Sequence, residues 1–218
     1  MWDIEKKAVL VAAQQMDQKG WVVGTSGNVS MRLRKATGQQ LLAITPTGRY
    51  YDSMNVDDIV VVNFDGELAE GKHTPSIETM LHMGIYKARK KVNAIIHIHP
   101  IFGSILAVTG LEVPPILDDQ VTYLGGEIKL AEYALSGTQD LVRNVVSALG
   151  SRNAVIMANH GALCVGRDMR EAFTNCEMLE KTAKIYINAL SVGKVRPLPA
   201  EALEMEKAFF DYVHGEGE

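Results

Sequence analysis

The sequence predicts a mixed α/β fold in one domain spanning residues 1–218. Amphipathic helical stretches alternate with short β-branched runs, and 218 residues with 47% hydrophobic side chains suffice for one sizeable core. No internal repeat or low-complexity tract divides the chain, and its only linker-like passage is residues 193–199. We therefore expect a single globular unit rather than a string of modules.

The first half of the chain predicts two helices and two strands. A helix is expected over residues 3–18, and strands over residues 41–45 and 59–64. Thr74-Pro75 predicts the start of the second helix, because Thr is a good N-cap and Pro is tolerated at the first helical position. The buried face of that helix would consist of Ile77, Leu81, Ile85 and Ala88.

The second half continues the alternation. The expected elements are a strand over 92–97, a helix over 101–108, a helix over 139–149, a strand that starts at residue 154 and ends in Asn159-His160-Gly161, a strand over 162–165, and two helices after residues 168 and 199. The apolar stripe of the helix after Asp168 reads as core and implies no cofactor site.

Charge and composition exclude several classes of protein. A net charge of −4 with one short basic run argues against nucleic-acid binding as the main task. No stretch approaches the roughly 20 apolar residues of a membrane helix, and the start lacks the pattern of a secretory signal. Cys164 and Cys176 are too few for a disulfide framework. We expect a cytoplasmic protein.

The run Ile95-Ile96-His97-Ile98-His99-Pro100 aims two imidazoles the same way, because residues i and i+2 of a strand share a face. His160 ends another apolar run, just before Gly161. Three imidazoles with an open fourth position form the ligand set of a catalytic zinc. An isolated histidine is more often a core or turn residue, so spacing alone leaves both interpretations open.

Three segments have the features of an anion site. The helix start at Ser76 would expose free backbone N–H groups, and the loops 24–30 and 45–48 carry glycines that let backbone amides approach a phosphate. Each loop could equally be a polar turn. Glu78 likewise has a structural interpretation, since a carboxylate is favourable near a helix N-terminus.

Five motifs occur in the order and spacing of a known family. They are Thr25-Ser26-Gly27-Asn28-Val29-Ser30, Thr45-Pro46-Thr47-Gly48, Pro75-Ser76-Ile77-Glu78, His97-Ile98-His99 and Asn159-His160-Gly161. On these residues the chain resembles the class II aldolase/adducin family over residues 4–190, and within it most resembles the L-fuculose-1-phosphate aldolases. The resemblance implies a three-layer α/β/α sandwich with a largely antiparallel central sheet, assembled as a homotetramer with active sites between subunits.

The resemblance also implies roles for particular residues. His97, His99 and His160 would hold Zn²⁺, with another divalent ion as the alternative, and Glu78 would be the catalytic acid/base. The substrate phosphate would be held by Gly27, Asn28, Thr47, Gly48 and Ser76. The implied reaction is reversible cleavage of a ketose 1-phosphate to dihydroxyacetone phosphate and an aldehyde through a metal-stabilised enediolate. Desolvation would raise the pKa of Glu78 toward neutrality.

The chain departs from the fuculose-phosphate aldolase pattern on the side that would meet the aldehyde. Ile77 replaces a second serine, and Asp119 stands where a tyrosine from the neighbouring subunit is expected, with Tyr123 displaced from that place. Tyr212 is the weaker match for a second neighbouring-subunit tyrosine. An aldehyde other than lactaldehyde is therefore an open alternative.

Other functions stay open as well. A pentulose-phosphate 4-epimerase would carry Asp in place of Glu78, so Glu favours an aldolase. Methylthioribulose-1-phosphate dehydratases and phosphosugar decarboxylases share the three histidines and a Glu. A non-catalytic module like the adducin head would be expected to lose metal ligands. A cupin would need a Glu soon after the histidine pair, and an amidohydrolase a longer barrel chain.

Overall fold

The computed structural model describes residues 2–34 and 38–215. Its centre is an eight-stranded sheet with the order β4-β3-β2-β1-β5-β8-β7-β6, in which only the β6–β7 pair is parallel. The largely antiparallel sheet is thereby confirmed. Its strands are β1 (Asn28–Arg34), β2 (Gln40–Ile44), β3 (Val60–Asn63), β4 (Leu68–Glu70), β5 (Ala94–Ile98), β6 (Lys129–Ala131), β7 (Ala154–Met157) and β8 (Gly161–Gly166).

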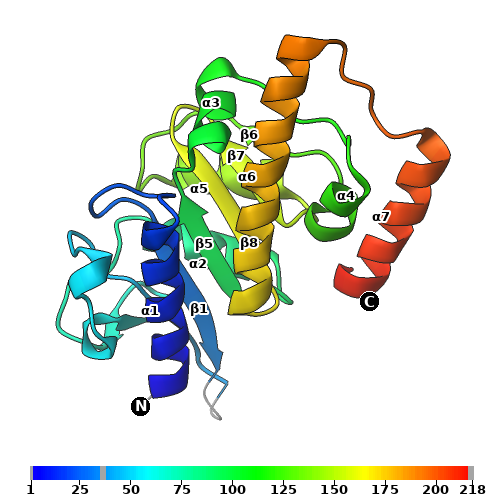
Figure 1. Ribbon diagram of the computed structural model, residues 1–218. Coiled ribbons are helices and arrows are strands. Elements are labelled where there is room, and N and C mark those ends of the chain that lie inside the picture. The colour runs from blue at the N-terminus through cyan, green and yellow to red at the C-terminus, as the bar shows by residue number, and fades with distance from the viewer. Residues whose placement is uncertain (1, 35–37, 216–218) are drawn as a thin grey trace.

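Helices cover both faces of the sheet, which confirms the three-layer arrangement (Figure 1). One face carries α1 (Asp3–Gln18), α3 (Ile101–Thr109) and α6 (Met169–Val192), and the other carries α2 (Thr79–Ala88) and α5 (Gln139–Leu149). The short α4 (Asp118–Leu124) and the C-terminal α7 (Ala200–His214) pack together beside α6. Two 3-10 turns, Tyr51–Ser53 and Val56–Asp58, follow β2.

Strand β5 lies near the middle of the sheet and is buried along its whole length. Ile96 and Ile98 join the apolar cluster under α1, α3 and α6, whereas Ile95 joins the cluster on the other face. This alternation confirms the prediction that His97 points away from Ile96 and Ile98. A buried strand therefore holds the first histidine rigidly.

The predicted helix start at Thr74-Pro75 is wrong. Helix α2 begins at Thr79, with Glu78 at its N-cap. Residues 74–76 instead pair with the loop after β2: Ser76 N–H donates to Thr45 O, and Pro46 and Pro75 form a β-bridge. Tertiary pairing thus overrides a local helix-start signal. Two residues of the predicted buried face are also exposed, since Ile77 lies before the helix and Ala88 at its solvent side.

Three strands, one α-helix and the two 3-10 turns were not predicted. Strand β1 begins inside the stretch that we interpreted as an anion-binding loop, so only residues 24–27 of that stretch form a loop. Strand β4, strand β6 and helix α4 are only three, three and seven residues long, too short for a clear periodic pattern. Within the described ranges, none of the helices combines the length and the apolar character needed to cross a membrane.

Candidate active site

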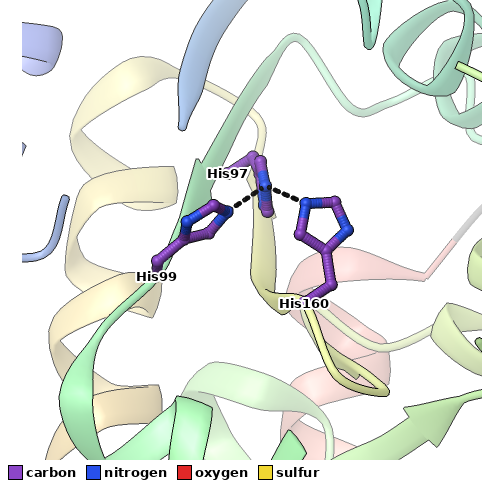
Figure 2. Close-up of side chains that lie close together, drawn as sticks. All are labelled: His97, His99 and His160. Carbon is purple, nitrogen blue, oxygen red and sulfur yellow. Dashed lines mark hydrogen bonds between the residues drawn. The ribbon is translucent and has the colours of Figure 1, made fainter. Parts of the chain in front are cut away.

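Three histidines converge at the end of β5, as Figure 2 shows. His97 lies on β5, His99 follows that strand, and His160 lies in the loop between β7 and β8. The Nε2 atom of His97 is 2.9 Å from Nε2 of His99 and 3.3 Å from Nε2 of His160. The structure therefore brings together all three predicted metal ligands.

The tautomer of His97 follows from its contact with Ala162. Nδ1 lies 2.9 Å from the carbonyl oxygen of Ala162, which can only accept, so Nδ1 carries a hydrogen, and in the neutral ring the lone pair is on Nε2. Burial, with the neighbouring imidazoles, lowers the pKa of His99 to about 3 and also lowers the pKa of His160. Neutral imidazoles are the form that binds metal.

The donor set fits a divalent metal ion. With zinc–nitrogen bonds of about 2.0–2.1 Å, tetrahedral ligand nitrogens lie roughly 3.3 Å apart, close to the separations of the triad. The three nitrogens all lie within 4.8 Å of one another. We therefore conclude that the triad could hold a divalent metal ion.

Local backbone geometry explains the order Asn159-His160-Gly161. Residues 158–160 join β7 to β8 as a three-residue hairpin loop, and Asn159 has the left-handed φ of 53° that such a loop requires. A Cβ on Gly161 would lie 2.5 Å from the Cδ2 atom of His99, so only glycine leaves room for that ring. The loop thus positions one ligand and makes space for another.

Glu78 lies directly against the triad and is only 3% exposed. Its Oε2 atom is 3.3 Å from Nε2 of His97, and its Oε1 atom is 3.4 Å from Nε2 of His160. Asn28 Nδ2 donates to Oε2 at 2.9 Å, whereas Oε1 has no hydrogen-bond partner among the described residues. A buried carboxylate oxygen without a partner, facing the histidines, is a second sign that a ligand belongs here.

The pKa of Glu78 moves opposite to our expectation. Burial by itself raises this pKa, but His97, the Asn28 amide and His160 outweigh burial and lower it to about 2. The expected rise toward neutrality is therefore wrong for the carboxylate in this environment. Glu78 is ionised at neutral pH and able to accept a proton.

A cavity of about 370 Å³ opens above Glu78 and the triad. The predicted phosphate-binding residues Gly27, Thr47 and Ser76 line it, with Thr25 and Ser26 of the first loop. Its lining includes no Lys or Arg side chain. An anion in this cavity would be held by neutral donors, which the sequence also predicted.

Asn28 and Gly48, the other two predicted phosphate ligands, have different surroundings from Gly27, Thr47 and Ser76. Asn28 lines the cavity, but its amide nitrogen is already engaged by Glu78. Gly48 follows Thr47 outside the cavity lining. Gly27 packs tightly against β5, since a Cβ there would lie 2.7 Å from the carbonyl oxygen of His97. One N–H of Asn28 is thus used by the Glu78 carboxylate, while Asn28 also lines the cavity, and its contact with a phosphate stays a prediction.

The three residues predicted to serve a neighbouring subunit lie away from this cavity within their own chain. Asp119 accepts from Lys181 Nζ at 2.5 Å, and Tyr123 and Tyr212 are 43% and 89% exposed. Two cavity residues were missed altogether: Val23, which precedes the first loop, and Ser136, from the loop between β6 and α5. The residues around Ser136 carry no chemical motif, so only the tertiary structure reveals it.

Comparisons with known proteins agree with this geometry. The family model "Class II Aldolase and Adducin N-terminal domain" matches residues 7–187. A 5-deoxy-D-ribulose 1-phosphate aldolase of Bacillus thuringiensis serovar kurstaki is 32% identical over 95% of this chain and 96% of its own. A 5-methylthioribulose-1-phosphate/5-deoxyribulose-1-phosphate aldolase of Rhodospirillum rubrum is 32% identical over 91% of this chain and 87% of its own.

A solved structure titled "L-fuculose 1-phosphate aldolase" superimposes with a TM-score of 0.88 at 32% identity, covering 95% of this chain and 96% of the other. The chain therefore belongs to the class II aldolase and adducin family and is a lyase of the aldolase type.

Proposed function

We propose that the protein is a metal-dependent aldolase that reversibly cleaves a ketose 1-phosphate to dihydroxyacetone phosphate and an aldehyde. The observation that carries this proposal is the Glu78 carboxylate against three converging imidazoles, at the base of a cavity lined by neutral donors. Relatives named for 5-deoxyribulose 1-phosphate favour a short 5-deoxy ketose as substrate. L-fuculose 1-phosphate is the alternative.

We assign His97, His99 and His160 as ligands of one Zn²⁺ per subunit. When bound, the ion supplies a Lewis acid that polarises the ketose carbonyl and stabilises the negative charge left when the carbon–carbon bond breaks. The Ala162 carbonyl holds the His97 ring in the tautomer that metal binding needs.

Glu78 is assigned as the residue that moves the proton on the carbon beside the carbonyl. In the synthetic direction this carbon gives a proton to the ionised Glu78 carboxylate. In the cleavage direction the sugar hydroxyl releases one proton as the aldehyde forms, and the Glu78 carboxyl group, having taken up a proton, returns one to the carbon that the aldehyde has left. Asn28 holds Oε2 in place by a hydrogen bond of 2.9 Å. The low pKa of Glu78 keeps it ready to accept that proton at neutral pH.

The phosphate end of the substrate is assigned to the loops around Gly27, Thr47 and Ser76. Binding there is remote from the bond that breaks, so its energy serves to orient the ketose over Glu78. The proton donor to the sugar oxygen would come from a neighbouring subunit of a homotetramer, with Asp119, Tyr123 and Tyr212 as the candidates.

The test is a panel of ketose 1-phosphates incubated with the zinc-loaded protein. Release of dihydroxyacetone phosphate, measured with a coupled dehydrogenase, is expected for one or more members. Acetaldehyde as the second product would select 5-deoxyribulose 1-phosphate, and lactaldehyde would select fuculose 1-phosphate. An epimerised, dehydrated or decarboxylated product without dihydroxyacetone phosphate would overturn the aldolase assignment. A protein that takes up no metal and turns over no ketose 1-phosphate would favour an adducin-like binding module.

A further inference from the structure

One face of β1 is polar although it is buried. Asn28, Ser30 and Arg32 are 4%, 0% and 6% exposed and alternate with apolar residues. Central strands that are buried on both faces usually carry apolar side chains, and buried polar groups need partners. Helix α2 and the residue that caps it supply a partner for each of these three side chains.

The partners recur along α2 at intervals of four residues. Two residues of a strand advance about 6.6 Å and four residues of a helix about 6 Å, so the two repeats stay in step. These contacts, termed the polar ladder below, join β1 to α2 at three successive levels. The rungs are Asn28–Glu78, Ser30–His82 and Arg32–Tyr86.

The middle rung is next to the catalytic rung and has no part in the catalysis assigned above. Ser30 and His82 are both 0% exposed and do not line the cavity. Ser30 Oγ lies 2.6 Å from His82 Nδ1 and 2.8 Å from the hydroxyl oxygen of Tyr86. His82 Nε2 has no hydrogen-bond partner in the described part of the chain. The Ser30 contact is therefore what holds this ring by hydrogen bonding.

His82 is also tied to Glu78 through the backbone. Its N–H donates to the carbonyl oxygen of Glu78 at 3.2 Å, a bond that closes the first turn of α2. Burial lowers the pKa of the His82 ring to about 3, so the ring is neutral and brings no charge beside the carboxylate. A shift of His82 would carry Glu78 with it, away from the triad.

We propose that His82, held by Ser30, is a positioning residue for Glu78. The Ser30–His82 rung sets the height and rotation of α2 against β1, and Asn28 on the same strand face lies opposite His97 of β5 in register. The carboxylate is thereby kept at its distance from the triad. This inference rests on the proposed function, in which Glu78 moves the proton.

The test compares Ser30→Ala with the control Asn175→Ala. Asn175 is equally buried, and its side chain donates to Val165 O at 2.8 Å, joining α6 to the sheet on the opposite face. Ser30→Ala removes the buried contacts of Ser30 Oγ with His82 and Tyr86, and Asn175→Ala removes the buried hydrogen bond to Val165, so both substitutions should lower the stability to urea. Only Ser30→Ala should lower kcat, by about tenfold or more, with KM and bound zinc within about twofold of wild type.

Two further measurements separate positioning from general damage. Amide hydrogen exchange at His82 should accelerate in Ser30→Ala and stay at the wild-type rate in Asn175→Ala. The double variant Ser30→Ala/His82→Gln should lose no more kcat than the worse single variant, because both substitutions remove the same contact between Ser30 and His82. Additive losses would indicate two independent effects and would overturn the proposal.

The outcomes also separate this inference from the proposed function. A wild-type protein that cleaves no ketose 1-phosphate would refute the proposed function. Amide exchange at His82 would still test whether the Ser30–His82 contact holds the start of α2. An active wild type with unchanged kcat and unchanged exchange in Ser30→Ala defeats the positioning role alone. Equal loss of kcat in Ser30→Ala and Asn175→Ala would defeat it too.

Discussion

The two ends of the cavity are built from different parts of the polypeptide. At the end that we propose binds metal, termed the metal end, His97 and Glu78 are 1% and 3% exposed and form hydrogen bonds with Ala162 and Asn28. At the end that we propose binds phosphate, termed the phosphate end, Thr47 is exposed in a loop and Ser76 lies in an extended segment before α2. One end is a set of rigid side chains, and the other is a set of loop groups.

The difference indicates how each end should respond to substitution. A buried ligand or base has no substitute nearby, so its removal should abolish a chemical step. Neutral loop donors share one anion among several groups, so the loss of one should weaken binding while leaving the chemistry intact. Effects at the metal end should therefore appear in kcat, and effects at the phosphate end in KM.

The largest expected effect is that of His97→Ala. Removing this imidazole should abolish stoichiometric zinc binding and lower turnover at least about a thousandfold, because a Lewis acid is worth several kcal/mol. Elemental analysis of the purified protein measures the metal. His214→Ala, which alters a histidine of α7 paired with Glu171, is the matched control and should retain zinc. Wild-type zinc content in His97→Ala would refute the ligand assignment.

The next effect is that of Glu78→Gln. The amide has the same shape as the carboxylate but cannot take up a proton, so kcat should fall by about a hundredfold or more. Zinc content and circular dichroism should match the wild type. If turnover stayed at the wild-type level, Glu78 would be left with the structural role of a residue at the start of α2.

The phosphate end should respond more mildly. Thr47→Val removes one hydroxyl and keeps the side-chain shape, so KM for a ketose 1-phosphate should rise about tenfold at nearly constant kcat. The dephosphorylated ketose serves as the control substrate: it should be far poorer with the wild type and unaffected by the substitution. Equal kcat/KM values of the wild type for the phosphorylated and the dephosphorylated ketose would refute the assignment of a phosphate subsite.

The smallest effect is expected behind the phosphate end, at Asp58. This buried carboxylate accepts hydrogen bonds from Arg49 Nη2 at 3.2 Å and from His73 Nε2 at 2.8 Å. It thereby joins the segment that follows Thr47 to the segment that precedes Ser76. Asp58→Asn should raise KM by only about two- to threefold, because the loops loosen without losing a donor, and should lower the free energy of unfolding by about 1 to 3 kcal/mol.

The pH dependence of that loss has a defined sign. Burial by itself raises the pKa of Asp58, but the Asn55 backbone N–H, His73 and Arg49 bring it below its ordinary value of 3.8. A carboxyl group with a lowered pKa in the folded state stabilises the fold above its ordinary pKa, and this contribution is lost at lower pH. In urea titrations, the free energy of unfolding of the wild type should therefore exceed that of Asp58→Asn at pH 7. The difference between the two should shrink as the pH falls below 3.8.

Local sequence was sufficient to predict elements with a long apolar repeat and sites where several chemical motifs occur together. Helices α1 and α5 begin and end at the predicted residues, because each has a complete apolar stripe and clear ends. The spacing of His97 and His99 alone predicted that both would face the same way. The five family motifs likewise suggested the correct family and the layers of the fold.

Contacts between distant segments decided the rest. The sequence Thr74-Pro75 predicts a helix start, yet pairing with residues 45–47 extends this segment and moves the start to Thr79. Asn28 resembles a loop donor in the sequence, yet its position on β1 directs its amide to Glu78. Residue spacing encodes direction along one element, whereas the distance between two elements depends on how they pack. That distance places Glu78 against the histidines and sets its pKa.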